Sequence, residues 1–551
     1  MQHEGQELTG AKLLADLIRR ATAGPIFHVP GEGVLELIDA VEGDGEASRL
    51  VTCRHENAAV TMAGVSGAMR GAPGVCLVGR APGALNAALA LHSCRTDETP
   101  VLLVVGDCIA HDTGRDVMLG DELAGTLRAI TGHAVYCPAA DRIEETFAAA
   151  LNAAMLPRMG VGVMVVSDNA WHEAVTPRPA RAEGWPLIAA PEIPAADAER
   201  LIARMQRAAK PVLIVGGGAW SDADASGLRA ALERLGVPAV SAYRFNDILA
   251  DDSAASAGEI GIGADPQLMA ALDEADFVLL AGARLSEINT FAPGSFQGFR
   301  LFNAGERFIA AVSTDPADAF SAYPVDRATG GRPASVVALL NRVEARAGWG
   351  AWQARLRRLR KDYTAIPGPL EPGDPRAIAE VVNALVPAAA AFTVGAGRYA
   401  HLPQRYLTTA RPQRYFGPKS GAMGYGLPAA IGAAMTDRSA RVLCFAGDGC
   451  FAMSGFELAT ARLYDANVTC IVFNDSRFTA IAANQRRHFG RTVGTDLAPI
   501  DFAAFAASMS VPARRVESLE DFMETLRHSA ATPGPFVIEV PVDNDGRCFA
   551  R

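Results

Sequence analysis

Two apolar, strand-like runs towards the C-terminus each end on an acidic residue. Gly447-Asp448-Gly449 follows residues 441–446, Asn474-Asp475 follows residues 468–473, and the 24 residues 450–473 separate the triplet from the pair. This spacing predicts a strand, a turn, a helix and a second parallel strand, which places both carboxylates at strand ends where open α/β sheets bind ligands. Oxygen donors from two strand ends suit Mg²⁺, and the glycines let backbone amides approach a diphosphate.

The alternation of strand and helix continues along the chain, which two proline-rich stretches, residues 176–194 and 366–375, divide into three pieces. A chain of 551 residues, 50% of them hydrophobic, is too long for one core. We therefore expect an α/β protein of three doubly wound parallel-sheet domains, at residues 1–176, 195–345 and 376–551. The first helix should begin at Thr9, a favourable N-cap residue.

Composition argues against several classes of protein. The net charge of −10 is spread along the chain and leaves no electrostatic footprint for nucleic acid. No apolar run approaches the length of a membrane span, and the N-terminus lacks the basic and apolar regions of a signal peptide. The 9 cysteines form no Cys-x-x-Cys pair, which favours buried free thiols. We expect a soluble, cytoplasmic protein that acts on a small molecule and binds neither nucleic acid nor membrane.

The acidic strand ends resemble the metal–diphosphate motif of thiamine diphosphate (ThDP) enzymes of the acetolactate synthase and 2-oxo acid decarboxylase superfamily. That motif is Gly-Asp-Gly, about two dozen residues, then Asn-Asn; here Asp475 replaces the second Asn, and Cys450 replaces a common Ser. The resemblance covers nearly the whole chain. Residues 54–59 resemble the segment with the cofactor-activating glutamate, residues 29–31 and 81–86 resemble two glycine turns, and residues 420–430 resemble the loop that supports the bent cofactor.

The resemblance implies a role for each matching position. Glu56 would activate the cofactor, Met423 would enforce its bent shape, and the Gly421 carbonyl would accept a hydrogen bond from its amine. The first and third domains would bind the pyrimidine and the diphosphate, with a Rossmann-like central domain between them. Implied cofactor contacts are Pro30, Glu56, Asn86, Gly395, Ala396, Gly397, Gly421, Met423, Gly447, Asp448, Gly449, Cys450, Asp475, Phe478 and Thr479, and implied metal contacts are Asp448, Asp475 and Arg477.

The substrate pocket departs from the family pattern. His28 occupies a position that is normally small, so it is either a structural hydrogen-bonding residue or a catalytic group that acts on the substrate. Ala396-Gly397 replaces the usual Gln-His pair, and the Phe-Gln pair of acetolactate synthases is absent near residues 115–122. These differences argue against standard acetolactate synthesis.

The leading hypothesis is therefore a ThDP- and Mg²⁺-dependent decarboxylase or carboligase that acts on a 2-oxo acid. The alternatives are a C–C lyase acting on an acyl-CoA or 2-hydroxy ketone, a flavin-linked oxidase, and a non-catalytic cofactor-binding relative, which Glu56 disfavours. Relatives use the central domain to hold FAD, ADP or neither; Gly216-Gly217-Gly218 without the full Gly-x-Gly-x-x-Gly spacing favours a plain turn. The resemblance also implies a homodimer or a dimer of dimers, with each cofactor bridging two subunits.

Overall fold

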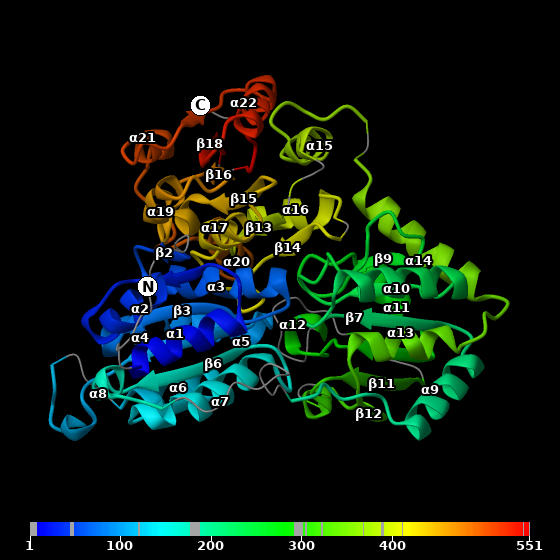
Figure 1. Cartoon of the computed structure of the whole chain (residues 1–551). Coiled ribbons are helices and arrows are strands. Elements are labelled where there is room, and N and C mark those ends of the chain that lie inside the picture. The colour runs from blue at the N-terminus through cyan, green and yellow to red at the C-terminus, as the bar shows by residue number, and fades with distance from the viewer. Residues whose placement is uncertain are drawn as a thin grey trace.

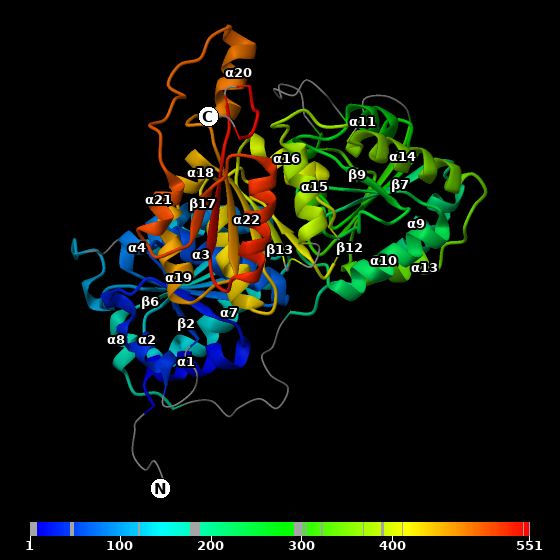
Figure 2. The same cartoon turned by 90° about the horizontal axis from the view of Figure 1, so that it is seen from above.

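The computed structural model describes residues 8–43, 49–118, 122–176, 188–290, 301–302, 306–320, 323–366, 368–386, 389, 391–409, 411–543 and 545–549. Most of the first proline-rich stretch, residues 177–187, lies outside this part. Three six-stranded parallel sheets with flanking helices make up the fold (Figure 1). The prediction of three doubly wound α/β units is confirmed. The C-terminal sheet and its helices pack on the N-terminal unit, and the central unit lies beside both (Figures 1 and 2).

The N-terminal sheet has the strand order β2-β1-β3-β4-β6-β5. Its strands are β1 (Ile26–His28), β2 (Leu50–Thr52), β3 (Gly74–Gly79), β4 (Val101–Gly106), β5 (Ala134–Cys137) and β6 (Val161–Val166). Its helices are α1 (Gly10–Ala21), α2 (Leu35–Glu42), α3 (Glu56–Arg70), α4 (Arg80–Asn86), α5 (Ala88–Asp97), α6 (Leu123–Thr131), α7 (Ile143–Met155) and α8 (Asp168–His172). Thr9 is the N-cap of α1, as predicted, and its side chain accepts a hydrogen bond from the Lys12 amide.

The central sheet has the order β12-β11-β10-β7-β8-β9, which is the Rossmann arrangement. Its strands are β7 (Pro211–Val215), β8 (Ala239–Ser241), β9 (Ser256–Glu259), β10 (Phe277–Ala281), β11 (Phe308–Ser313) and β12 (Arg327–Gly330). Its helices are α9 (Ala195–Arg207), α10 (Asp222–Leu235), α11 (Pro266–Leu272), α12 (Glu287–Thr290), α13 (Pro333–Asn341) and α14 (Trp349–Thr364). Strands β7 and β10 are buried along their whole length, which explains their continuous apolar sequence.

The C-terminal sheet has the order β14-β13-β15-β16-β18-β17, the same topology as the N-terminal sheet. Its strands are β13 (Ala391–Val394), β14 (Arg414–Phe416), β15 (Val442–Gly447), β16 (Val468–Asn474), β17 (Ala513–Arg515) and β18 (Phe536–Pro541). Its helices are α15 (Arg376–Leu385), α16 (His401–Tyr406), α17 (Gly426–Thr436), α18 (Asp448–Ala452), α19 (Leu458–Leu463), α20 (Thr479–Phe489), α21 (Phe502–Ala507) and α22 (Leu519–Ala531).

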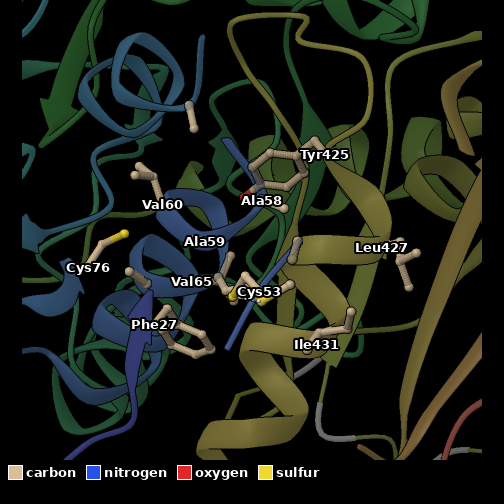
Figure 3. Packing of buried hydrophobic residues seen from close by; sticks show 14 of the residues in the cluster. Phe27, Cys53, Ala58, Ala59, Val60, Val65, Cys76, Tyr425, Leu427 and Ile431 are labelled. Carbon is tan, nitrogen blue, oxygen red and sulfur yellow. Dashed lines mark hydrogen bonds between the residues drawn. The ribbon is translucent and has the colours of Figure 1, made fainter. Parts of the chain in front are cut away.

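Helices α3 and α17 form the contact between the N-terminal and C-terminal units (Figure 3). Phe27, Val60 and Tyr425 belong to one buried apolar cluster that runs through both sheets. A Cβ atom at Gly432 would lie 2.5 Å from the Met62 carbonyl oxygen, so a glycine is needed for this close approach. The two units therefore share a core and hold the ends of their strands in a fixed relation.

All 9 cysteines are buried free thiols, as the scattered spacing predicted. Among the described helices, none combines the length and the apolar character that crossing a bilayer requires.

Candidate active site

The two acidic strand ends lie side by side in the C-terminal sheet. Strands β15 and β16 are parallel neighbours with Gly447 opposite Phe473, so Asp448 and Asp475 leave the same sheet edge. The Gly449 amide donates to Asp448 Oδ1 at 2.7 Å, and the Thr479 hydroxyl donates to Asp475 Oδ2. The structure therefore brings together the predicted metal pair and two of its predicted neighbours.

Burial makes this carboxylate pair costly in the absence of a cation. Burial raises the pKa of Asp448 to about 6, against stabilising hydrogen bonds from the Gly449, Ser476 and Arg477 amides, and the charge of Asp475 raises it further. Burial also raises the pKa of Asp475. A divalent cation would offset both the desolvation of the two carboxylates and the repulsion between them. Carboxylate oxygens are hard donors, which fit Mg²⁺.

The two carboxylates cannot complete a metal site by themselves. Within the described ranges no group of three or more His, Cys, Asp or Glu side chains could hold a metal ion. Mg²⁺ commonly fills such a shortfall with phosphate oxygens and water. Arg477, a predicted metal contact, directs its side chain elsewhere: its Nε donates to Asp496 Oδ1 at 2.7 Å. A guanidinium has no lone pair to offer, so Arg477 could contribute only its backbone carbonyl.

Tyr399 fills a notch among the glycines at this sheet edge, a feature that the sequence did not reveal. A Cβ atom at Gly395 would lie 2.3 Å from the Tyr399 hydroxyl; at Gly397 and Gly447 it would lie 2.6 and 2.7 Å from Tyr399 Cε1. The ring stacks on Phe473 with centroids 6.1 Å apart. Burial raises the pKa of Tyr399 well above its usual range, so its hydroxyl stays protonated. These glycines are therefore needed for side-chain packing as well as for any approach by a diphosphate.

The loop that carries Met423 is tied to the Gly-Asp-Gly turn. The Gly424 amide donates to Cys450 Sγ at 3.2 Å, which links the loop to the first turn of α18. Gly421 and Gly424 have φ of +76° and +78°, the left-handed region that favours glycine. Met423 is half-buried and Gly421 is exposed. Their roles towards the cofactor remain predictions.

Glu56 is the first residue of α3, and its carboxylate rests on the α4 turn. Asn86 Nδ2 donates to Glu56 Oε2 at 3.0 Å, and a Cβ atom at Gly83 would lie 3.2 Å from Oε1. The structure therefore joins two residues that the sequence assigned to the cofactor site. One residue earlier, the His55 amide donates to Glu457 Oε1 at 3.0 Å, which ties the start of α3 to the C-terminal unit.

Phe478, a further predicted cofactor contact, packs on the Gly-Asp-Gly turn. A Cβ atom at Gly449 would lie 2.6 Å from Phe478 Cε1. Ala396 and Gly397 follow β13 beside this turn, where Tyr399 takes the space that larger side chains would need.

His28 lies at the end of β1, where it faces a cavity of about 820 Å³. Its Nε2 is 3.0 Å from the Thr52 hydroxyl, and its Nδ1 has no hydrogen-bond partner among the described residues. Burial lowers the pKa of His28, so the ring is neutral at pH 7. The residues lining this cavity include neither Glu56 nor Asp448. Pro30 is exposed two residues further on. The catalytic role of His28 remains a prediction.

Comparison with known proteins adds independent information. The family models for the N-terminal TPP binding domain, the central domain and the C-terminal TPP binding domain of thiamine pyrophosphate enzymes match residues 8–127, 198–340 and 395–540. Acetolactate synthase of Bacillus subtilis is 28% identical, over 97% of this chain and 93% of that protein. The acetolactate synthase isozyme 2 large subunit of Escherichia coli is 24% identical, over 97% and 96%.

A solved structure has the same fold. The Rhodococcus jostii RHA1 thiamine diphosphate-dependent 4-hydroxybenzoylformate decarboxylase superposes with a TM-score of 0.82 at 23% identity, covering 97% of this chain and 99% of that one.

Proposed function

The chain belongs to the thiamine pyrophosphate enzyme family, and from this premise we propose that it is a ThDP- and Mg²⁺-dependent enzyme that decarboxylates a 2-oxo acid, with or without joining the remaining fragment to a second carbonyl compound. The observation that carries the proposal is the position of Glu56 at the start of α3, with its carboxylate held by Asn86. A glutamate fixed in this way is what activation of the cofactor requires, and a protein that only bound the cofactor would not need it.

The chain supplies orientation, charge and proton control around the cofactor. When bound, ThDP would supply a carbon nucleophile for the substrate carbonyl and an electron sink for decarboxylation. Glu56 would accept a hydrogen bond from the pyrimidine ring, and Asn86 would keep the carboxylate in place. Asp448 and Asp475 would hold Mg²⁺ against the diphosphate, with the Thr479 hydroxyl orienting Asp475. Fixing the reacting groups in contact lowers the barrier by up to ~7–11 kcal/mol in favourable cases.

The same premise supports a homodimer or a dimer of dimers with cofactor sites shared between subunits. Glu56 begins α3 of the N-terminal unit and Asp448 begins α18 of the C-terminal unit, and large apolar side chains are exposed beside each of them. Leu85 and Leu89 follow Gly83 with 45% and 49% exposure, and Met453 and Phe456 follow Cys450 with 58% and 67% exposure. A second copy of the chain would cover these side chains. Sedimentation equilibrium tests this point: a monomer with ThDP bound would contradict it.

Reconstitution of the stripped protein tests the proposed reaction. The protein is freed of metal and cofactor with a chelator and then supplied with ThDP, Mg²⁺, both or neither. It is then presented with a panel of 2-oxo acids, with products identified by mass. We expect CO₂ release from at least one 2-oxo acid only when both are present.

Two variants sharpen this test. Glu56→Gln should abolish CO₂ release from the 2-oxo acid. Glu520→Gln, the same substitution at an exposed first-turn residue of α22, should not change it. Turnover of an acyl-CoA or a 2-hydroxy ketone without turnover of any 2-oxo acid would contradict the proposal.

A further inference from the structure

The glycine turn that follows β7 of the central sheet binds the carboxylate of Glu98. Strand β7 runs into Gly216-Gly217-Gly218, the position at which nucleotide-binding Rossmann domains receive a phosphate. The Gly218 amide donates to Glu98 Oε2 at 2.9 Å. Glu98 belongs to the N-terminal unit, where it ends α5.

A second group from the central unit completes the site around this carboxylate. Arg284 follows β10, and its Nη2 lies 3.1 Å from Glu98 Oε1 and also donates to the Thr96 carbonyl. The Glu98 side chain is only 7% exposed. One oxygen therefore accepts from a backbone amide and the other pairs with a guanidinium, which is the donor set that glycine turns and nearby arginines offer to a phosphate.

The turn and α5 are shaped for this contact. A Cβ atom at Gly218 would lie 2.2 Å from the Glu98 carbonyl oxygen, and one at Gly217 would lie 3.2 Å from Glu98 Oε2. Glu98 itself has φ +59° and ψ +42°, a left-handed conformation that residues other than glycine and asparagine rarely adopt. The unfavourable backbone conformation indicates that the side chain is needed at this position.

Little space remains for a ligand. Trp220 lines the same cavity as Glu98, and its Nε1 donates to the Gly216 carbonyl at 2.9 Å. Arg158 of the N-terminal unit forms an ion pair with Asp318 of the central unit at the rim. The cavity left between these groups is about 20 Å³, enough for about one water molecule, whereas ligand pockets measure about 300–1,000 Å³.

We propose that Glu98 is a built-in ligand of the central domain, whose carboxylate takes the place of a nucleotide phosphate and fastens the central unit to the N-terminal unit. The central domain is then an oxyanion-binding platform that is filled by the chain itself, not a carrier of FAD or ADP. This inference does not rest on the reaction proposed above.

The residue before Glu98 also contacts the loop that carries Met423. Asp97, the residue before Glu98, accepts from the Lys419 and Ser420 amides at 2.8 and 3.3 Å, directly before Gly421. The end of α5 therefore connects the N-terminal unit to both other units, and loss of the Glu98 contact should loosen the support of the loop that carries Met423.

Anion rescue of full-length Glu98→Ala tests the proposal without any measurement of turnover. We expect its thermal midpoint to fall by ~3 °C or more. Sodium formate, which restores the missing carboxylate, should recover at least half of the loss relative to sodium chloride at equal ionic strength. Glu199→Ala, which removes an exposed ion pair with Arg342 within the central unit, is the matched control and should show neither effect.

A second variant and a binding measurement complete the test. Glu98→Gln keeps the size of the side chain but lacks the charge for an ion pair with Arg284, so its thermal midpoint should fall without response to formate. It carries the test if Glu98→Ala does not fold. By calorimetry, wild type should show no saturable binding of ADP or FAD up to ~1 mM. Saturable binding of either nucleotide by wild type, a Glu98→Ala midpoint equal to that of Glu199→Ala, or a loss that formate does not recover would overturn the proposal.

Discussion

Gly447→Ala should displace the Tyr399 ring, and the effect should vanish when Tyr399 is removed. Gly447 has φ −85° and ψ +156°, a conformation that alanine adopts freely, so any cost of the substitution is steric. The new Cβ would lie 2.7 Å from Tyr399 Cε1, where ordinary contact begins at 3.4 Å. Gly397 would be a poorer choice, because its φ of +155° adds backbone strain to the clash.

The magnitude follows from overpacking of a well-packed site. Forcing one extra methyl group into such a site costs ~1–3 kcal/mol. For a unit of this size that corresponds to a fall of roughly 2–12 °C in thermal midpoint. In a Tyr399→Ala background the ring is gone, and Gly447→Ala should change the midpoint by less than ~2 °C. The coupling between the two substitutions should therefore carry nearly the whole effect.

The assay is a double-mutant cycle of four proteins, compared by thermal midpoint at one concentration and without cofactor. Gly125→Ala in α6 is the matched control, since its new Cβ would meet no atom closer than 3.6 Å and alanine favours a helix. An equal fall caused by Gly447→Ala in both backgrounds would refute the packing argument, because the cost would then not depend on the ring.

Three further predictions concern other residues. Asp448→Ala should lose ThDP and Mg²⁺ binding together in calorimetric titration, whereas Asp475→Asn should retain both; the reverse pattern would contradict the ligand assignment. Burial raises the pKa of Glu259 from 4.5 to about 8, so the folded state binds this proton more tightly and stability falls as the pH rises between these values. Glu259→Gln should therefore raise the free energy of unfolding by between ~1 and ~5 kcal/mol at pH 8 and flatten the dependence of the thermal midpoint on pH. An unchanged pH profile would show that Glu259 ionises freely in the folded protein. His28→Ala should lower turnover and leave ThDP affinity within a few-fold; full activity per folded molecule with a lower midpoint would make His28 a scaffold residue.

The sequence was sufficient to predict the sheets and the acidic strand ends, because both depend on local patterns. Continuous apolar runs that end in Gly-Asp or Asn-Asp specify buried parallel strands with polar groups at one edge. The pairing of Asp448 with Asp475 then follows from the register of β15 and β16. The contact between Glu56 and Asn86 also joins two segments whose motifs were visible in the sequence.

The contacts that were missed join residues with no local signal. No motif in the sequence predicts the packing of Tyr399, and only the folded structure shows its ring against Gly395, Gly397 and Gly447. Glu98 ends α5, and its partner Gly218 is 120 residues away in another unit. The Glu98 contact depends on how the units dock, and periodicity within one unit contains no information about docking.

Exchange of the cofactor C2 proton measures whether Glu56 activates the cofactor. Wild type and Glu56→Gln are each saturated with ThDP and Mg²⁺ in deuterated buffer, quenched with acid, and analysed by NMR for the remaining C2 proton. Glu520→Gln serves as the control. If Glu56 activates the cofactor, Glu56→Gln should bind ThDP within a few-fold of wild type and exchange the proton several orders of magnitude more slowly. Exchange at the wild-type rate in Glu56→Gln with cofactor bound would show that Glu56 does not activate the cofactor.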